Sequence, residues 1–289
     1  MVDALFMSIR DAALMLFRGG VLVSDRAEGT LGSYSLVDIT NRLIFSAKEF
    51  GQRNGVCFKY YCLLSGQDYP VRSVSSIAAE LRTSYPQPFI DCTPIEKGNW
   101  VFNGSKNSAW HTSIERAINQ RMKPGLLRKA VKAPIAGANI ITRFFSNSAR
   151  TLKRKGIDLH GGSAWWVLPD IMIDEIVTEA IGFGKNSKFW ELRNVLVPEE
   201  CFYQTILMNG EYKNFVTINP PTMVAQNCKT FAYFHPAGKP FTGHPYIFTM
   251  FDRRLLEKLS QTYFFARKFD INVDCNVLDW IDDNLLAQP

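Results

Sequence analysis

The stretch FKYYCLLSG, residues 58–66, decides the fold that the sequence predicts. It is a continuous apolar run, rich in aromatic side chains and ended by a glycine, which is typical of a central strand buried on both faces. An amphipathic helix over 35–51 is expected before it, closed by Gly51, with a serine-capped helix over 73–84 and a strand over 88–95 after it. This alternation predicts an α/β fold with a mostly parallel central sheet flanked by helices.

The rest of the chain continues this pattern without an internal repeat or an interdomain linker. We therefore expect a single domain over residues 1–289, interrupted by a basic, variable insertion at about 104–157. Further elements are expected as strands at 21–26 and 215–219, a strand followed by a helix within 163–182, and helices over 249–262 and 276–286.

The net charge of +6 comes from one segment. Residues 116–157 contain eleven lysines and arginines and no acidic residue, and subtracting eleven from +6 leaves the remainder at about −5. Such a segment favours peripheral contact with an anionic membrane, and a solvated loop is the alternative. Because it lacks the interleaved aromatic side chains of single-strand binders, apart from Phe144 and Phe145, no nucleic-acid partner is expected.

Common enzyme signatures are absent: the sequence has no P-loop, no GxGxxG after a strand, no GxSxG and no HExxH. It also has no Asp-x-Asp, with which many sugar-nucleotide enzymes hold a divalent metal. The six cysteines lack zinc-type spacing and are expected to be mostly buried free thiols, and the four histidines to be structural or exposed. Since no signal peptide or transmembrane anchor is found, a cytoplasmic location, peripheral at the membrane, is expected.

Five stretches, taken in order, resemble a known family. They are LGSYSLVD (31–38), LLSGQDYPV (63–71), GGSAWWVLPDIMIDEIV (161–177), VPEECFYQTILMN (197–209), and FFARKFD (264–270) with VLDWID (277–282). Together they resemble the core-2/I-branching β-1,6-N-acetylglucosaminyltransferase family, which includes the peptide O-xylosyltransferases. The resemblance runs from about residue 21 to 283, apart from the basic stretch.

This resemblance implies a GT-A-type glycosyltransferase fold and an inverting, metal-independent transfer from a UDP-sugar. The acceptor would be a hydroxyl of a glycan or lipid-linked saccharide, and the new linkage would be β. N-acetylglucosamine is the first expectation for the donated sugar and xylose the second. No metal or other cofactor is expected.

The carboxylate pair Glu199 and Glu200 follows a proline at the start of a helix-like run. Acidic residues in a first turn complement the helix dipole, so the residues alone favour a structural role for both. Inversion, however, requires one carboxylate to deprotonate the attacking hydroxyl while UDP leaves from the opposite face. The resemblance assigns this catalytic base to Glu200 and leaves Glu199 as a neighbour or cap among the sugar and acceptor contacts.

The leaving diphosphate requires positive charge. The resemblance places Arg267 and Lys268 of FFARKFD on it, whereas the residues alone favour an exposed basic pair near a helix end. In some family members an upstream arginine adds a second phosphate contact. Its place falls near His244 and Pro245, where this chain has no arginine.

Further site residues are expected at the end of the predicted central strand, where open α/β sheets bind ligands. The resemblance implies that Ser65, Gln67 and Asp68 border the donor site, and the alternative for Asp68 is the capping of a turn. Trp165 and Trp166 alternate across a strand, so at most one faces the cleft to stack on a sugar, and the other belongs in the core.

The start of the chain departs from the family pattern. The family's first strand–helix unit precedes a strand ending in His-Val-Asp-like residues, and this chain begins near the end of that strand, at Val2 and Asp3. The fold is therefore expected to be N-terminally shortened. This departure also motivates the alternative function, a degenerate, non-catalytic relative that binds a glycan or a protein partner.

Overall fold

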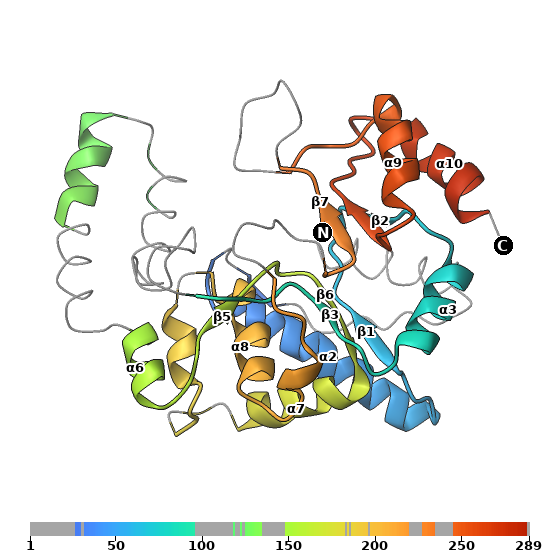
Figure 1. The fold of residues 1–289 in the computed structure, drawn as a ribbon. Coiled ribbons are helices and arrows are strands. Elements are labelled where there is room, and N and C mark those ends of the chain that lie inside the picture. Colours follow the sequence, from blue (N-terminus) through green and yellow to red (C-terminus); the bar gives the residue numbers. More distant parts are fainter. Residues whose placement is uncertain are drawn as a thin grey trace.

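Figure 1 shows the chain as a computed structural model in which helices surround several small sheets. The structure describes residues 27–29, 32–95, 118, 122, 125–134, 148–182, 184, 186–195, 197–219, 227–234 and 245–287. The predicted strand at 21–26 and part of the basic segment lie outside these ranges, as do Val2, Asp3, His111, His235 and His244. Within the described ranges, no helix combines the length and the apolar character needed to cross a bilayer.

The strands are short and form three separate sheets, ordered β1–β6–β3, β2–β8–β7 and β4–β5. Of the five pairings between described strands, only β7 with β8 is parallel. The predicted GT-A-type α/β fold with a mostly parallel central sheet is therefore wrong. The strands are β1 (Tyr60–Cys62), β2 (Asp68–Pro70), β3 (Phe89–Ile90), β4 (Thr93–Pro94), β5 (His160–Gly161), β6 (Trp166–Pro169), β7 (Thr230–Ala232) and β8 (Phe265–Arg267).

The stretch FKYYCLLSG does not form the central strand that its pattern predicts. Only three of its residues pair, as β1 at the edge of the first sheet, and the last of them, Cys62, is exposed. The central position belongs to β6, whose four residues are all buried. Aromatic side chains of this run pack against the preceding helix instead, and the Phe58 ring stacks on the Phe50 ring at 6.5 Å between centroids. Its apolar character reflects ring packing on a helix rather than burial on two faces of a sheet.

Helices occupy more of the described chain than strands do. The prediction over 73–84 is confirmed, as are the helix near 276–286 and the strand followed by a helix in 163–182. The helix expected over 249–262 ends earlier, at Leu259. The helices are α2 (Ser35–Asn54), α3 (Val74–Ser84), α6 (Ser148–Arg154), α7 (Asp170–Ile181), α8 (Phe202–Met208), α9 (Arg253–Leu259) and α10 (Asn276–Ile281), the short 3₁₀ helices η1 (Trp190–Asn194), η2 (Pro198–Glu200), η3 (Lys213–Phe215) and η4 (Met250–Asp252), and the π-helix η5 (Asp282–Leu286); residues 126–134 are also helical.

Helix α2 runs past the glycine that was expected to end it. Gly51 is buried inside the helix, and the chain leaves the helix at Gly55, which has φ 65°. The Gly55 amide donates to Gln52 O, and the Val56 amide donates to Gly51 O at 2.9 Å. These two bonds make a Schellman motif, which needs a left-handed residue after the last turn. The positive φ at position 55, rather than the presence of a glycine at 51, therefore ends the helix.

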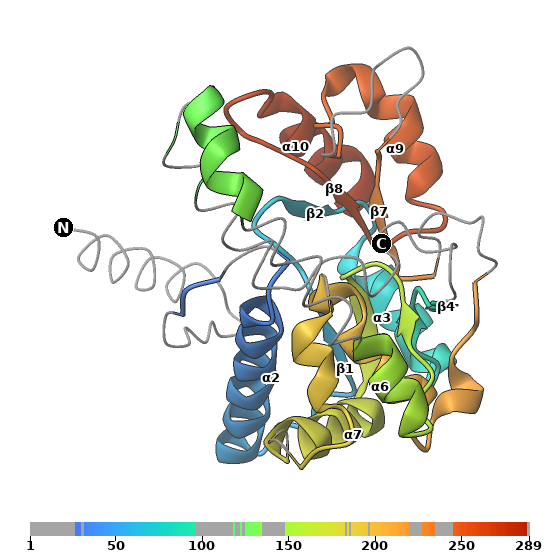
Figure 2. The ribbon, with the colours of Figure 1, turned by 90° about the vertical axis from the view of Figure 1, so that its left-hand side faces the viewer.

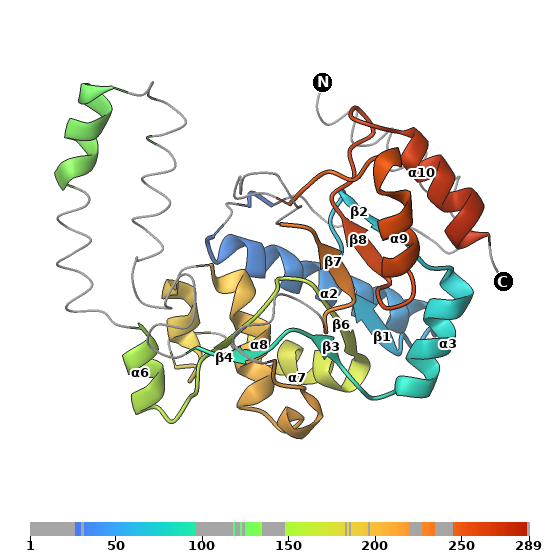
Figure 3. The same cartoon turned by 45° about the horizontal axis from the view of Figure 1, so that its top comes forward.

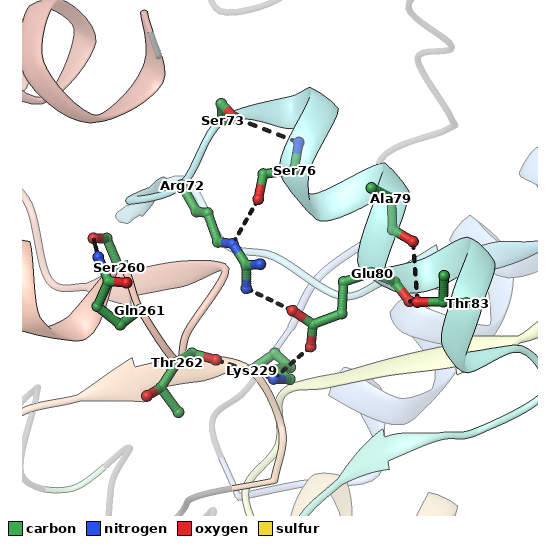
Figure 4. Close-up of polar contacts among 10 residues, drawn as sticks. All are labelled: Arg72, Ser73, Ser76, Ala79, Glu80, Thr83, Lys229, Ser260, Gln261 and Thr262. Carbon is green, nitrogen blue, oxygen red and sulfur yellow. Dashed lines mark hydrogen bonds and ion pairs between the residues drawn. The ribbon is translucent and has the colours of Figure 1, made fainter. Parts of the chain in front are cut away.

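Helix α3 is attached to the second sheet by a partly buried ion network, drawn in Figure 4. The Glu80 carboxylate accepts a hydrogen bond from Arg72 Nη1 at 2.6 Å, and its other oxygen lies 2.8 Å from Lys229 Nζ. Lys229 also donates to Thr262 O at 3.0 Å. At the start of α3, the amide of Ser76 donates to Ser73 Oγ, as the serine cap predicted.

The predicted strand at 88–95 is divided between two sheets, with β3 in the first and β4 in the third. The buried side chain of Asn219 fills the break: its Nδ2 donates to Asp91 Oδ1 at 3.1 Å, and its backbone amide donates to Cys92 O at 2.7 Å. The stretch 215–219 is thus not the strand that was predicted, and it pairs with no described strand. This stretch begins at the end of η3 and leads the chain to the buried Asn219.

The described elements fall into two groups, each with its own apolar core. In Figures 1–3, β2, β8 and β7 lie with α9 and α10, whereas α2, α7 and α8 lie with β1, β6 and β3. The larger core includes Leu152 of α6 and Met172 of α7, and the second includes Leu256 of α9 and Val277 of α10. A small cluster containing Val167 and Phe264 lies between β6 and β8. Both groups contribute residues to the candidate site.

Candidate active site

The carboxylate pair lies on the short helix η2, directly before α8. Val197, which precedes it, has φ 56° and ψ 59°, a left-handed conformation that is an outlier for a β-branched residue. The Glu200 amide donates to Val197 O at 3.0 Å, and the Cys201 amide donates to Pro198 O at 3.0 Å. The backbone thus makes a tight turn, which fixes the positions from which the two glutamate side chains extend.

Glu199 has a structural contact of its own. Its side chain is buried, and Oε1 accepts a hydrogen bond from the amide of Gly32 at 2.9 Å. Gly32 has φ 75° and stands three residues before α2. Glu199 therefore attaches the start of α2 to η2, and its burial leaves little surface for a sugar or an acceptor.

Glu200 is only partly buried, and its surroundings make it a strong proton acceptor. Burial and, to a smaller extent, the neighbouring charge of Glu199 together raise the pKa of Glu200 to about 8. A helix N-terminus by itself would lower that pKa, so desolvation outweighs the dipole here. A carboxyl group that titrates near neutral pH is suited to general base catalysis.

Asp68 is the centre of a second cluster at the end of the Ser65–Gln67 turn. Its Oδ2 accepts hydrogen bonds from the Ser65 amide and from Trp165 Nε1, both at 2.7 Å. Its Oδ1 accepts from Ser65 Oγ at 2.9 Å and lies 3.4 Å from Arg267 Nε. The turn-capping alternative for Asp68 is thus realised, and the same carboxylate also connects three stretches that are far apart in sequence.

Arg267 is buried in this cluster rather than exposed to a ligand. Its guanidinium carbon lies 3.6 Å from the centre of the Trp165 ring, and β8 places it directly opposite Asp68 of β2. Nε has no hydrogen-bond partner among the described residues, so the contact with Asp68 is an ion pair without hydrogen-bond geometry. Burial lowers the pKa of Arg267, and the charge of Asp68 opposes that shift.

Lys268 is the more available cation of the predicted pair. Its backbone is fixed on both sides, since its amide donates to Tyr246 O at 3.2 Å and its carbonyl accepts from Phe248 N at 2.9 Å. Its side chain is partly exposed, and within the described ranges no ion pair or hydrogen bond holds Nζ. Gln67 lies beside it: its side chain is exposed and its carbonyl accepts from Phe269 N at 2.9 Å.

The segment Gly162–Trp165 connects the carboxylate pair to the Asp68 cluster. The Gly162 amide donates to Glu200 O at 2.9 Å, and Trp165, three residues later, contacts Asp68 and Arg267. A Cβ at position 162 would lie 1.8 Å from Asp91 O, so only glycine fits between these two backbones. The structure therefore connects the GGSAWW, PEE, SGQDYP and ARKFD stretches through these contacts, and not within one mostly parallel sheet.

The two tryptophans have different environments. Trp166 is 2% exposed and packs against Tyr203 at 5.2 Å between ring centroids, so it belongs to the core and offers no surface to a sugar. Trp165 is partly exposed, and one face of its ring is covered by Arg267. Only its other face could stack on a ligand.

Gln204 is a positioning residue that the sequence interpretation missed. It is fully buried on α8, and its Nε2 donates to Ser163 O at 2.8 Å, which holds the Gly162–Trp165 segment against the helix. A glutamine in the largely apolar run FYQTILM was the available signal, because a buried amide needs a partner.

Among the described residues, no group of three or more His, Cys, Asp or Glu side chains is arranged to hold a metal ion. Of the histidines, His160 is buried and bonds through Nδ1 to Asp158 O at 3.0 Å, which is a structural role. Three of the six cysteines, Cys57, Cys62 and Cys275, are exposed, so the expectation of mostly buried thiols holds only for the other three.

Comparison with known proteins adds no relative to this description. No protein-family model matches the sequence. A search of the curated proteins also found no match. The resemblance therefore rests on the five sequence stretches alone.

Proposed function

We propose that this chain is an inverting glycosyltransferase that moves a sugar from a UDP-sugar to a hydroxyl group of a glycan acceptor. The observation that carries the proposal is Glu200, a partly buried carboxyl group with its pKa raised to about 8. Its backbone is hydrogen-bonded to the segment that leads to Asp68, Arg267 and Lys268. N-acetylglucosamine is the proposed sugar and xylose the second choice, and both rest on the resemblance alone.

In the proposed reaction, the ionised Glu200 carboxylate accepts the proton of the acceptor hydroxyl. The hydroxyl oxygen then forms a bond to the anomeric carbon from the face opposite the diphosphate. The bond between that carbon and the diphosphate oxygen breaks, and its electron pair leaves with UDP. One proton moves to Glu200 and one C–O bond replaces another, with inversion at the anomeric carbon.

In this proposal, Lys268 stabilises the negative charge that develops on the leaving UDP. Its backbone is held between Tyr246 and Phe248, so its side chain starts from a fixed position. A fixed cation beside a leaving diphosphate lowers the barrier most where charge accumulates in the transition state. Arg267 contributes differently: the Asp68–Arg267–Trp165 contacts hold strand β8, which directly precedes Lys268.

The test uses Glu200→Gln, with Glu211→Gln as a matched control, because Glu211 is an exposed glutamate that follows α8 and lies outside the candidate site. Transfer from UDP-N-acetylglucosamine and UDP-xylose is followed by UDP release, and UDP binding by calorimetry. We expect Glu200→Gln to abolish transfer and to retain UDP binding, while Glu211→Gln behaves like the unmodified chain. Full transfer by Glu200→Gln would contradict the proposal.

A second variant examines the leaving group. Lys268→Met should weaken binding of UDP by about tenfold or more and leave binding of uridine unchanged, because only UDP carries the diphosphate. If the unmodified chain binds neither UDP nor either UDP-sugar, the alternative of a non-catalytic relative that binds a glycan or a protein partner is favoured instead.

A further inference from the structure

Residues 126–134 form an exposed helix with two chemically distinct faces. At about 100° per residue, its apolar and basic residues fall on opposite arcs of the helix. The apolar arc carries Leu126, Leu127, Ala130, Val131, Ala133 and Pro134, and the basic arc carries Arg128, Lys129 and Lys132. Leu126 is 86% exposed, Leu127 72% and Val131 38%.

This exposure is unusual for an amphipathic helix, which in a globular protein normally buries its apolar face against a core. In Figures 1 and 3 the helix stands apart from α2, α7 and α8 and from the three sheets. Helix α6 lies on the same left-hand side of Figure 1 but behaves differently, because its Leu152 is fully buried in the larger core. An apolar face of this kind generally indicates an interaction surface.

The charge around the helix indicates which partner would cover it. The sequence from 116 to 157 has eleven basic residues and no acidic one, and α6 with the residue after it presents Lys153, Arg154 and Lys155 to solvent. A second copy of the chain would bring the same positive charges to the contact and be repelled. An anionic lipid surface supplies both an apolar layer and negative charge.

We infer that helix 126–134 docks this protein on an anionic lipid bilayer. The helix lies in the plane of the interface, with Leu126, Leu127 and Val131 in the headgroup–acyl boundary. The exposed Lys129 extends past the apolar arc to the lipid phosphates, as long basic side chains do at interfaces. The basic residues of α6 add long-range attraction without insertion. This inference does not depend on the proposed transferase reaction.

Flotation of the full chain with vesicles tests the inference. Vesicles of phosphatidylcholine alone are compared with vesicles that also contain phosphatidylglycerol. We expect binding to the anionic vesicles, little binding to the neutral ones, and release by high salt. Equal binding to both vesicle types, or binding to neither, would overturn the inference.

Two variants separate the contributions of the two faces. Replacing Arg128, Lys129 and Lys132 with Gln should weaken binding on the order of a hundredfold, since each cation near an anionic surface contributes roughly a fivefold factor. Leu126→Gln with Leu127→Gln should weaken it at least about tenfold through lost apolar burial. Both leave the buried cores untouched, so folding should be unchanged.

Matched controls come from exposed residues elsewhere. Replacing Arg253, Arg254 and Lys258 of α9 with Gln removes three exposed cations from one helix. Replacing Val74 and Ile181 with Gln removes two apolar side chains that are each 75% exposed. These controls should bind anionic vesicles like the unmodified chain. If they weaken binding as much as the helix variants do, or if the leucine variant changes only the oligomeric state in sedimentation, the assignment to a lipid surface is wrong.

Discussion

The guanidinium carbon of Arg267 lies 3.6 Å from the centre of the Trp165 ring, although Arg267 belongs to β8 and Trp165 directly precedes β6, a strand of another sheet. Asp68 completes the arrangement, because it accepts a hydrogen bond from the Trp165 indole and forms an ion pair with Arg267. A cation between an aromatic face and a carboxylate is stabilised by both contacts. The cluster therefore attaches the strand that precedes Lys268 to the segment that is bonded to Glu200.

Asp68→Asn should destabilise this cluster strongly. The substitution keeps the shape of the side chain but leaves a buried guanidinium without its counter-charge, which typically costs about 3 kcal/mol or more. Urea unfolding measures the difference in the free energy of unfolding. Asp283→Asn, at an exposed aspartate of η5, is the control and should change this quantity by less than about 0.5 kcal/mol. Equal stability of the two variants would show that the ion pair contributes nothing.

The pH dependence of transfer should reflect the ionisation of the Glu200 carboxyl group. Because burial and Glu199 raise its pKa to about 8, the carboxyl group is largely protonated at neutral pH and ionises as the pH rises. A general base acts in its ionised form, so kcat/KM should rise with pH through about 8 and then level off. Initial rates under subsaturating donor measure this profile. A profile that falls across that range would contradict the role of base.

The ion network of α3 should stabilise the fold at neutral pH and not in acid (Figure 4). Burial alone would raise the pKa of Glu80, but the contacts with Lys229 and Arg72 outweigh it and hold that pKa below its ordinary value. Since the folded-state pKa is lowered, the contribution is present above the unfolded value and is lost as the pH falls through the folded one.

Glu80→Gln should therefore lower the free energy of unfolding by about 1–2 kcal/mol at neutral pH, and by progressively less as the pH falls below the ordinary pKa of a glutamate. Urea unfolding at neutral pH and at an acidic pH measures the change. Glu49→Gln removes an ion pair between exposed side chains, Glu49 with Arg53, and should cost less than about 0.5 kcal/mol at either pH. A pH-independent loss in Glu80→Gln would indicate packing rather than charge.

Gly162→Ala should be poorly tolerated for steric reasons. The added Cβ would lie 1.8 Å from Asp91 O, a backbone atom that is held between β3 and β4. We expect a loss of at least about 2 kcal/mol in the free energy of unfolding and a large loss of transfer, because the segment bonded to Glu200 must shift. Gly66→Ala is the control, since nothing lies within 4 Å of its added Cβ. Similar thermal unfolding of both variants would show that the contact is not tight.

Local sequence signals identified several elements correctly. The serine cap and helical spacing fixed α3, and the sequence WVLPD followed by an amphipathic run fixed β6 and α7. The relevant signals are short-range, because capping and helix periodicity depend on residues within one or two turns. Strand pairing is not short-range. The apolar run at 58–66 reads as a central parallel strand, yet it became an antiparallel edge strand because β6 took the central place.

The candidate site shows the same division. The motif order assigned Glu200, Asp68, Arg267 and Lys268 to one site, and the structure brings their stretches together through Gly162 and Trp165. The sequence could not divide the roles between Trp165 and Trp166, or between Arg267 and Lys268. Burial separated Trp166 in the core from Trp165 at the cluster, and it separated Arg267 in an ion pair from the more available Lys268. The spacing of residues in the sequence does not show which of two adjacent side chains is buried.

The sequence by itself determined the helices with clear caps, the four stretches that contribute to the site, and the position of the carboxylate pair. Only the tertiary structure decided how the strands pair, that Glu199 bonds to Gly32, and that the pKa of Glu200 is raised to about 8. The physical reason is the range of the interactions. Caps and periodicity act between neighbours in sequence, whereas desolvation, ion pairing and sheet register depend on groups that only folding brings into contact.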